Sequence, residues 1–300
     1  MLQAPVARLK AGSTRALVRI PVTTGVYTRP AYYDAAFSYI EPVAQVNVFR
    51  NFISAFSKRG VNSVLDVCCG PGDVLCEFAA QGYGCVGLDL SRQMVSYALK
   101  KASEKGVRIK AVVADMRCFE LEEPVDFAFI MNGSINYVLD QEGLRSHLRS
   151  VSSSLKAGGL YLIENAHMAW PRGLRRTGKT PTQTWTGSLG RIKTRAFYRL
   201  ELQDNHSSEV IEHLDIHVKE GKRRRVFKEE TRMRLILRRQ LEDLVAHDGS
   251  FELVGWFKRA EPLPLLRPRR DNMLVLRKID PEASRLEPPC FRVLVSTHIV

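Results

Sequence analysis

The first residues that could do chemistry lie in the stretch SVLDVCCGPGDVLCEFA, Ser63 to Ala79. Asp66 lies inside a short apolar run, which ends in Cys68-Cys69-Gly70-Pro71-Gly72. A strand that ends in a glycine turn and starts a helix can bind an anion or a nucleotide, because glycine lets the backbone approach the ligand and the free N–H groups of the helix start attract negative charge. This turn lacks the third glycine of the dinucleotide pattern, since Leu75 takes that place. Alone, it is a weak indication of a ligand site.

Two further acids strengthen that indication. Asp89 ends the second apolar run, where a carboxylate can accept hydrogen bonds from both hydroxyls of a ribose. Asp115 ends the third run and can accept from an exocyclic amine, while its neighbour Met116 lies on a purine ring. Open α/β sheets bind ligands at the carboxyl ends of their strands. Three acids at three such ends, together with the glycine turn, predict a nucleotide-binding site.

The elements that must position these acids are short strands alternating with helices. This alternation predicts right-handed crossovers and a parallel sheet covered on both faces. An amphipathic helix over Tyr39 to Phe56 precedes it. The expected strands are Ser63–Cys68, Gly84–Leu88, Ile109–Ala114, Asp126–Met131 and Leu160–Ile163, and the expected helices between them are Val74–Ala80, Gln93–Ala102 and Glu142–Leu155.

The pattern changes after residue 169. Apolar and charged residues alternate over 192–200, 210–218 and 226–236, which predicts an antiparallel sheet with one face in water. A helix over Arg239–His247 and strands over Phe251–Phe257 and Asn272–Leu276 follow, with a proline-rich loop between the two strands.

The composition excludes some classes of protein. A chain of 300 residues can form one large domain or two modest ones. No apolar run reaches the roughly 18 residues of a membrane-spanning helix. The six cysteines form no CxxC pair, so we expect a reduced, cytoplasmic protein without structural zinc.

The net charge of +13 is concentrated in the second half, where residues 171–280 carry 25 basic and 15 acidic side chains. This half faces either an anionic partner or only solvent. The basic first residues resemble an organellar import signal, but Pro5 and Pro21 interrupt any helix there. We therefore expect residues 1–29 to be a disordered extension and residues 279–300 to be a tail.

Five motifs together resemble those of the class I S-adenosylmethionine-dependent methyltransferases. They are VLDVCCGPG at 64–72, VGLDLS at 86–91, VVADMR at 112–117, FAFIMNGSINYV at 127–138 and LKAGGLYLIE at 155–164. The resemblance implies an α/β, Rossmann-like fold with a mostly parallel seven-stranded sheet, helices on both faces and an inserted antiparallel β lid. The expected parts are a cofactor-binding core over 30–168, the lid over 169–236, and a closing helix with the last two strands over 237–278.

The resemblance also implies roles for single residues. Asp66 would organise the glycine loop around the methionine end of S-adenosylmethionine, Asp89 would bind its ribose and Asp115 its adenine amine. Cys68 and Cys69 are interpreted as small packing residues and not as nucleophiles. The implied cofactor-binding residues are Tyr33, Asp66, Cys68, Gly70, Gly72, Asp89, Leu90, Met94, Asp115, Met116, Met131 and Asn132.

Within the family, YYDAAFSYI at 32–40 and MNGSINY at 131–137 resemble the small-molecule branch, which includes sugar N-methyltransferases and glycine N-methyltransferase-like enzymes. In that branch an N-terminal tyrosine, here Tyr33, reaches the cofactor. The alternative is that Tyr32, Tyr33 and Phe37 only pack a lid helix.

Several acceptor classes fit the sequence poorly. Residues 131–134 are not the Asn/Asp-Pro-Pro-aromatic turn of enzymes that methylate nucleobase amines. The Pro-Cys pair of carbon-5 methylation occurs only at 289–290, in the tail. Only Glu164 and Asn165 lie near the place of a metal-assisted catechol site, so we predict no metal.

A small amine, hydroxyl or carboxylate therefore remains as the methyl acceptor. The candidate catalytic residues are Tyr33, Tyr137 and His167, and His213 and His217 on the insert are weaker candidates. Two alternatives stay open: an RNA or protein methyltransferase that uses the basic insert, including Arg223-Arg224-Arg225, and a cofactor-binding protein without activity. We expect a monomer or a homodimer.

Overall fold

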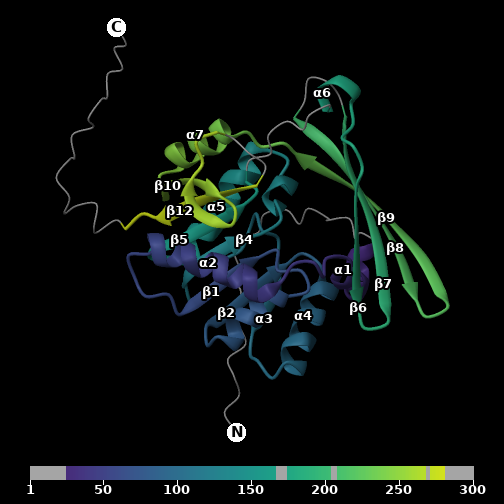
Figure 1. The fold of residues 1–300 in the computed structure, drawn as a ribbon. Coiled ribbons are helices and arrows are strands. Elements are labelled where there is room, and N and C mark those ends of the chain that lie inside the picture. Colours follow the sequence, from purple (N-terminus) through teal and green to yellow (C-terminus); the bar gives the residue numbers. More distant parts are fainter. Residues whose placement is uncertain (1–24, 167–173, 204–207, 268–270, 281–300) are drawn as a thin grey trace, which may run out of the picture.

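The computed structural model describes residues 25–166, 174–203, 208–267 and 271–280 (Figure 1). Its main sheet has eight strands in the order β11-β10-β12-β5-β4-β1-β2-β3. The strands β3, β2, β1, β4 and β5 are parallel to one another, and the other three are antiparallel. Their bounds are β1 Ser63–Val67, β2 Gly84–Asp89, β3 Lys110–Val113, β4 Val125–Ile130, β5 Leu155–Glu164, β10 Phe251–Lys258, β11 Glu261–Pro264 and β12 Asn272–Lys278.

The prediction of seven strands was wrong by one. The segment expected to be a proline-rich loop contains β11, which pairs with β10 at the edge of the sheet. Pro262 and Pro264 do not prevent this pairing, because an edge strand does not need every backbone N–H for a second neighbour. The backbone N–H of Leu265 then donates to the carbonyl oxygen of Trp256 and holds the edge in place.

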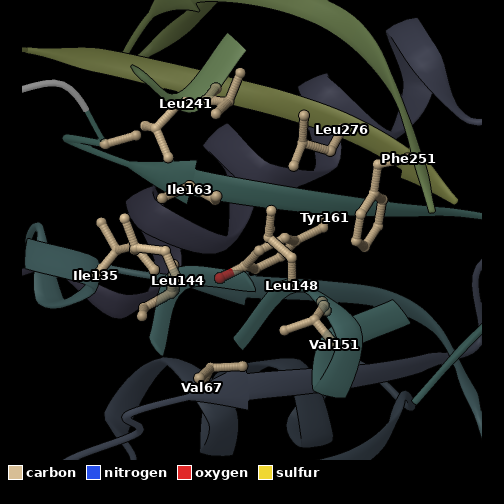
Figure 2. Close-up of a cluster of buried hydrophobic side chains, with 14 of the residues drawn as sticks. Val67, Ile135, Leu144, Leu148, Val151, Tyr161, Ile163, Leu241, Phe251 and Leu276 are labelled. Carbon is tan, nitrogen blue, oxygen red and sulfur yellow. The ribbon is translucent and has the colours of Figure 1, made fainter. Parts of the chain in front are cut away.

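Helices cover both faces of the main sheet, as expected. In β4, Phe127 and Phe129 face one cluster of buried side chains, and Ala128 and Ile130 face the other. The first cluster includes Phe49 of α2 (Pro42–Phe56) and residues of α3 (Asp73–Ala80), and α4 (Arg92–Glu104) packs beside α3. The second cluster lies between the sheet, α5 (Gln141–Ser153) and α7 (Arg238–Asp248), as Figure 2 shows.

The inserted sheet is a separate four-stranded antiparallel meander in the order β6-β7-β8-β9. Its long strands lie to one side of the main sheet, beyond α1 (Figure 1). Its inner face packs on η1 (Val26–Thr28) and α1 (Pro30–Ala36), which precede the core in the chain. The strands are β6 Gln183–Leu189, β7 Ile192–Leu202, β8 Glu209–Glu220 and β9 Arg223–Arg234, and the short helix α6 (Leu174–Thr177) precedes them.

The structure describes residues 25–29, which we expected to belong to a disordered N-terminal extension. Val26 is fully buried, and its backbone N–H donates to the Glu229 carboxylate of β9. Apolar contact with the inserted sheet therefore orders residues 25–29, and this contact has no signature in the local sequence. The expected C-terminal tail lies, apart from residues 279 and 280, outside the described residues. No helix in the described ranges is long and apolar enough to cross a membrane.

Candidate functional site

The turn between β1 and α3 has an unusual backbone. Cys68, Gly70 and Gly72 have positive φ angles of 65°, 52° and 78°. At Gly72 a Cβ atom would lie 2.7 Å from the Cβ of Ala98 in α4, so only glycine lets the two helices approach at this point. Burial raises the pKa of the Cys68 and Cys69 thiols well above the usual value, which keeps both in the neutral, weakly nucleophilic form.

Asp66 lies beneath this turn and is 3% exposed. Its carboxylate forms no hydrogen bond or ion pair with any residue that the structure describes. Burial, and then the charge of Asp89, raise its pKa well above the usual value. Because an unpaired buried carboxylate is costly, the site favours a cation or hydrogen-bond donors at this position.

Asp66 faces a cavity of about 550 Å³ at the carboxyl ends of the parallel strands. The turn after β1 supplies Cys68 and Gly70, the loop after β4 supplies Met131 and Asn132, and α1 supplies Tyr33 to its wall. The structure therefore brings together six of the predicted cofactor-binding residues, from three separate parts of the chain.

Asp89 joins two loops beside this cavity. Its Oδ2 accepts from the Gly70 N–H at 2.9 Å, and its Oδ1 accepts from the Ser91 N–H at 2.8 Å. Burial raises the pKa of Asp89, and these two hydrogen bonds partly oppose that rise. A carboxylate has about four acceptor positions, so two remain for ligand hydroxyls.

The Asp115 carboxylate is engaged by a neighbour. Arg117 donates to both of its oxygens, with the shortest distance 2.6 Å. Burial raises the pKa of Asp115, but the Arg117 hydrogen bonds and charge outweigh burial and leave the pKa below its usual value. Met116 lies with its sulfur 3.6 Å from that of Cys68, and the buried ring of His147 bonds its backbone oxygen at 2.8 Å.

Other predicted cofactor residues lie outside the cavity wall. Leu90 is 51% exposed, whereas Met94, in the first turn of α4, is 1% exposed. The residues that do not line the cavity are Gly72, Asp89, Leu90, Met94, Asp115 and Met116. The catalytic candidate His167 lies outside the described residues.

The loop after β4 is held from below by Glu164. Asn132 has a positive φ of 56°, and its backbone N–H donates to Glu164 Oε2 at 2.7 Å. Glu164 is fully buried, and its Oε1 lies 3.2 Å from an Arg259 nitrogen. Glu164 thus stabilises the strained loop that carries Asn132 to the cavity.

A charged contact at the cavity rim was not predicted from the sequence. Lys101 Nζ of α4 lies 2.7 Å from Asp34 of α1 and 2.6 Å from Asp73 of α3. Tyr97 also donates to Asp34 at 2.8 Å. These contacts join α1 to the core beside Tyr33. The only local sign is the lysine's place four residues after Tyr97, on one face of the helix.

The inserted sheet contributes a second residue that was missed. Glu212 of β8 is 6% exposed and accepts a hydrogen bond from the Tyr137 hydroxyl at 2.8 Å. It stands in the apolar register of its strand, and an acid at such a position is the one signal that could have revealed it. His213 and His217 alternate with this register and face the other side of the sheet, where His213 pairs with Glu201 and Glu230.

Comparison with known proteins agrees with this geometry. A family model described as a methyltransferase domain matches residues 64–159. The dTDP-4-amino-2,3,4,6-tetradeoxy-D-glucose N,N-dimethyltransferase of Saccharopolyspora spinosa is 33% identical over 102 residues, which is 34% of this chain and 39% of that protein. The curated relatives are matched over about half of their length or less.

Two solved structures share the fold over most of their length. An S-adenosylmethionine-dependent methyltransferase from Clostridium acetobutylicum has a TM-score of 0.68 at 16% identity, with 83% of this chain and 96% of that chain covered. The sugar N-methyltransferase KedS8 from Streptoalloteichus sp has a TM-score of 0.67 at 18% identity, with 91% and 100% covered. These findings show that residues 64–159 match a methyltransferase domain and that the chain shares the fold of these two methyltransferase structures.

Proposed function

We propose that this protein transfers the methyl group of S-adenosylmethionine to a nitrogen or oxygen atom of a small molecule. The observation that carries the proposal is the unpaired, buried Asp66 carboxylate at the wall of the cavity. A cofactor with an ammonium group and a sulfonium centre supplies the positive charge that this carboxylate lacks. The names of the relatives, which include amino-sugar N-methyltransferases, support a small-molecule acceptor.

Residues of the cavity wall and residues beside the cavity suit such a cofactor by their donor and acceptor types. Asp66 and the amides of the Cys68–Gly72 turn would hold its amino-acid part. Asp89 would accept from its ribose hydroxyls, for which two acceptor positions remain. Asp115 and Met116 would border its base, although Asp115 first has to share its oxygens with Arg117.

Bound S-adenosylmethionine supplies an electrophilic methyl group, and the protein's contribution is alignment and exclusion of water. Tyr33 of α1 and Phe37, the residue that follows α1, stack at 4.4 Å between ring centroids and cover the cavity on one side. Holding acceptor and methyl group in line replaces a bimolecular encounter with an intramolecular one, which is worth up to about 7–11 kcal/mol of barrier.

Calorimetry with S-adenosylmethionine, followed by release of S-adenosylhomocysteine against pools of amines, phenols, acids and RNA, tests the proposal. Asp66→Asn keeps the shape of the side chain and removes its charge, so we expect affinity to fall about 10- to 100-fold. Asp243→Asn on the exposed face of α7 is the matched control and should bind normally. A wild-type chain that does not bind S-adenosylmethionine would contradict the proposal.

A further inference from the structure

The inner face of the inserted sheet carries two acids where apolar residues are expected. In β8 the buried register is Val210, Glu212, Leu214, Ile216 and Val218. In β9, Glu229 is cross-strand partner to Leu214 and is 7% exposed, close to the 6% of Glu212. An ionised carboxylate is costly in such surroundings unless a cation pairs with it. Neither acid forms an ion pair with a lysine or arginine of the described part of the chain.

The two acids differ in what holds them. Glu229 accepts from the backbone N–H of Val26, and a Cβ at Gly25 would overlap its carboxylate, so it is committed to fixing the N-terminal segment. Among the described residues, Glu212 is held by two phenols: Tyr137 donates to its Oε2 at 2.8 Å, and Tyr198 of β7 also hydrogen-bonds it. Of the two acids, Glu212 is therefore the one whose carboxylate can accept a proton through its tyrosine partners.

A row of tyrosines leads from Glu212 to the cavity. Tyr137, in η2 (Ser134–Tyr137) after β4, interacts with Tyr27 of η1. The ring of Tyr27 lies 5.4 Å from that of Tyr33, which lines the cavity with Asp66. Burial raises the pKa of Tyr33 and Tyr137 well above the usual value, so both hydroxyls stay neutral and can relay a proton without holding a charge.

The electrostatic surroundings make Glu212 a base near neutral pH. Burial, and to a smaller extent the charge of Glu229, raise its pKa from 4.5 to about 7, against the lowering effect of the two tyrosine hydrogen bonds. The groups that face it are Tyr137 from η2, Tyr198 from β7, Glu229 from β9 and Tyr27 from η1. A base acts best when its pKa lies close to the working pH.

We propose that Glu212, acting through the Tyr137 hydroxyl, takes the proton that a primary or secondary amine must lose before methyl transfer. This inference rests on the proposed function and narrows its acceptor to amines. An alkylammonium ion has no lone pair, so one N–H proton passes to the hydroxyl of Tyr33 at the cavity wall. Tyr33 and Tyr27 each pass on their own proton along the row, and the Tyr137 proton passes to the Glu212 carboxylate. The neutral nitrogen lone pair then forms the N–C bond, the C–S bond breaks, and sulfur keeps the electron pair as a thioether.

The negative charge of the inner face of the inserted sheet disfavours carboxylate and hydroxyl acceptors. A carboxylate acceptor would meet two buried acids of its own sign. An aliphatic hydroxyl is too weak an acid for a base of pKa about 7, whereas an ammonium group, with a pKa of roughly 10.4 in lysine, is much closer and is attracted to Glu212 before the transfer. Glu212 is a positioning residue here, since Tyr33 is the residue of the row that lines the cavity.

The test compares Glu212→Gln, which keeps the size of the side chain and one acceptor oxygen but removes the basic carboxylate, with Asp215→Asn, which faces the opposite side of the same strand. Each is assayed from pH 5.5 to 8.5 on a panel of amino sugars and the matching hydroxyl sugars. We expect the wild type to act on the amines with kcat/KM rising through pH about 7, as protonated Glu212 gives up its proton. In Glu212→Gln, kcat/KM should fall about 100-fold and should no longer rise through pH about 7, while the affinity for S-adenosylmethionine stays the same. Asp215→Asn should match the wild type.

A second variant tests the inference even if Glu212→Gln fails to fold. Tyr198→Phe removes a hydrogen bond that lowers the Glu212 pKa, so the midpoint of the pH profile should move upward. An unchanged midpoint, a wild-type pH profile in Glu212→Gln, or a preference for hydroxyl sugars would overturn the inference while leaving methyl transfer intact. A wild type that binds cofactor but methylates nothing in the panel would instead contradict the proposed function, and this inference would fall with it.

Discussion

The main sheet and the inserted sheet hold their acids in different ways. In the main sheet, Asp89 and Asp115 stand at strand ends. Ser91 and Arg117, each two residues further along the chain, donate to them, and Asp89 also accepts from the Gly70 N–H of the glycine turn. In the inserted sheet, Glu212 and Glu229 stand in mid-strand, and their partners Tyr137 and Val26 come from distant parts of the chain. The partners of the second pair can therefore be found only once distant segments of the chain have packed together.

The two sheets also differ in how they are covered. Helices bury both faces of the main sheet. Within the described residues, the inserted sheet packs only its inner face, on η1, α1, α6 and η2. Most of the free energy of folding should therefore reside in the main sheet, and the insert should tolerate substitution of its outer face.

Phe49→Ala should show the largest effect. Its ring is fully buried against Phe78, Phe127 and Phe129, so the cavity left behind should cost about 3–5 kcal/mol of unfolding free energy. Phe197→Ala, the same change on the outer face of the insert, should cost less than about 1 kcal/mol. Urea unfolding of both variants measures the difference, and equal costs would refute the contrast between the two sheets.

His147 should make the main sheet sensitive to acid. Burial lowers its pKa from 6.5 to about 4, and its ring bonds the Met116 backbone oxygen and the Tyr161 hydroxyl. Because the folded state binds the proton less readily, stability is full above pH 6.5 and falls as the pH drops toward 4, by up to about 3 kcal/mol. Unfolding curves of His147→Gln should lack this loss; an identical slope in wild type and variant would exclude it.

The raised pKa of Glu212 predicts the opposite pH dependence of stability in the insert. Its folded-state pKa of about 7 lies above the usual 4.5, so its contribution is full below pH 4.5 and is lost as the pH rises through 7. The loss is again at most about 3 kcal/mol. Between pH 5 and pH 8, the free energy of unfolding should fall more in the wild type than in Glu212→Gln. If both proteins show the same change with pH, Glu212 carries its charge over this whole range in the folded state.

Asp89→Ala should weaken S-adenosylmethionine binding by about 1–3 kcal/mol, because it removes the acceptor offered to the ribose and frees the Gly70 N–H. Asp215→Ala, an acid on the outer face of the insert, is the control and should leave affinity unchanged. If calorimetry gives Asp89→Ala the wild-type affinity, the assignment of this residue to the ribose is wrong.

Replacing Arg223, Arg224 and Arg225 with serine should have the smallest effect. All three are exposed at the start of β9, and only Arg225 lies over a ring, that of Tyr32 at 5.8 Å. We expect stability within about 0.5 kcal/mol and unchanged turnover of a small molecule. Loss of methyl transfer with cofactor binding retained would favour RNA as acceptor, and affinity for RNA should then fall about a thousandfold between 50 and 200 mM salt.

Local patterns in the sequence predicted most of the main sheet and the residues at its strand ends. The alternation of apolar runs with helices and the glycine turn are local patterns, and acids at strand ends share one edge because parallel strands all point the same way. These patterns located Asp66 and the antiparallel insert. They missed β11, because its prolines contradict the usual strand pattern and only the free edge of β10 makes the pairing possible.

The role of Glu212 and the way the loops are held could be seen only in the tertiary structure. Glu212 stands at an ordinary apolar position of its strand, and its proposed role depends on its contact with Tyr137, 75 residues away in the chain. Likewise the loop at Asn132 is held by Glu164, and α1 is joined to the core by Lys101, through contacts that no local pattern encodes. The physical reason is that burial and the identity of the facing group set the cost and the pKa of a charge, and both arise only when distant segments pack together.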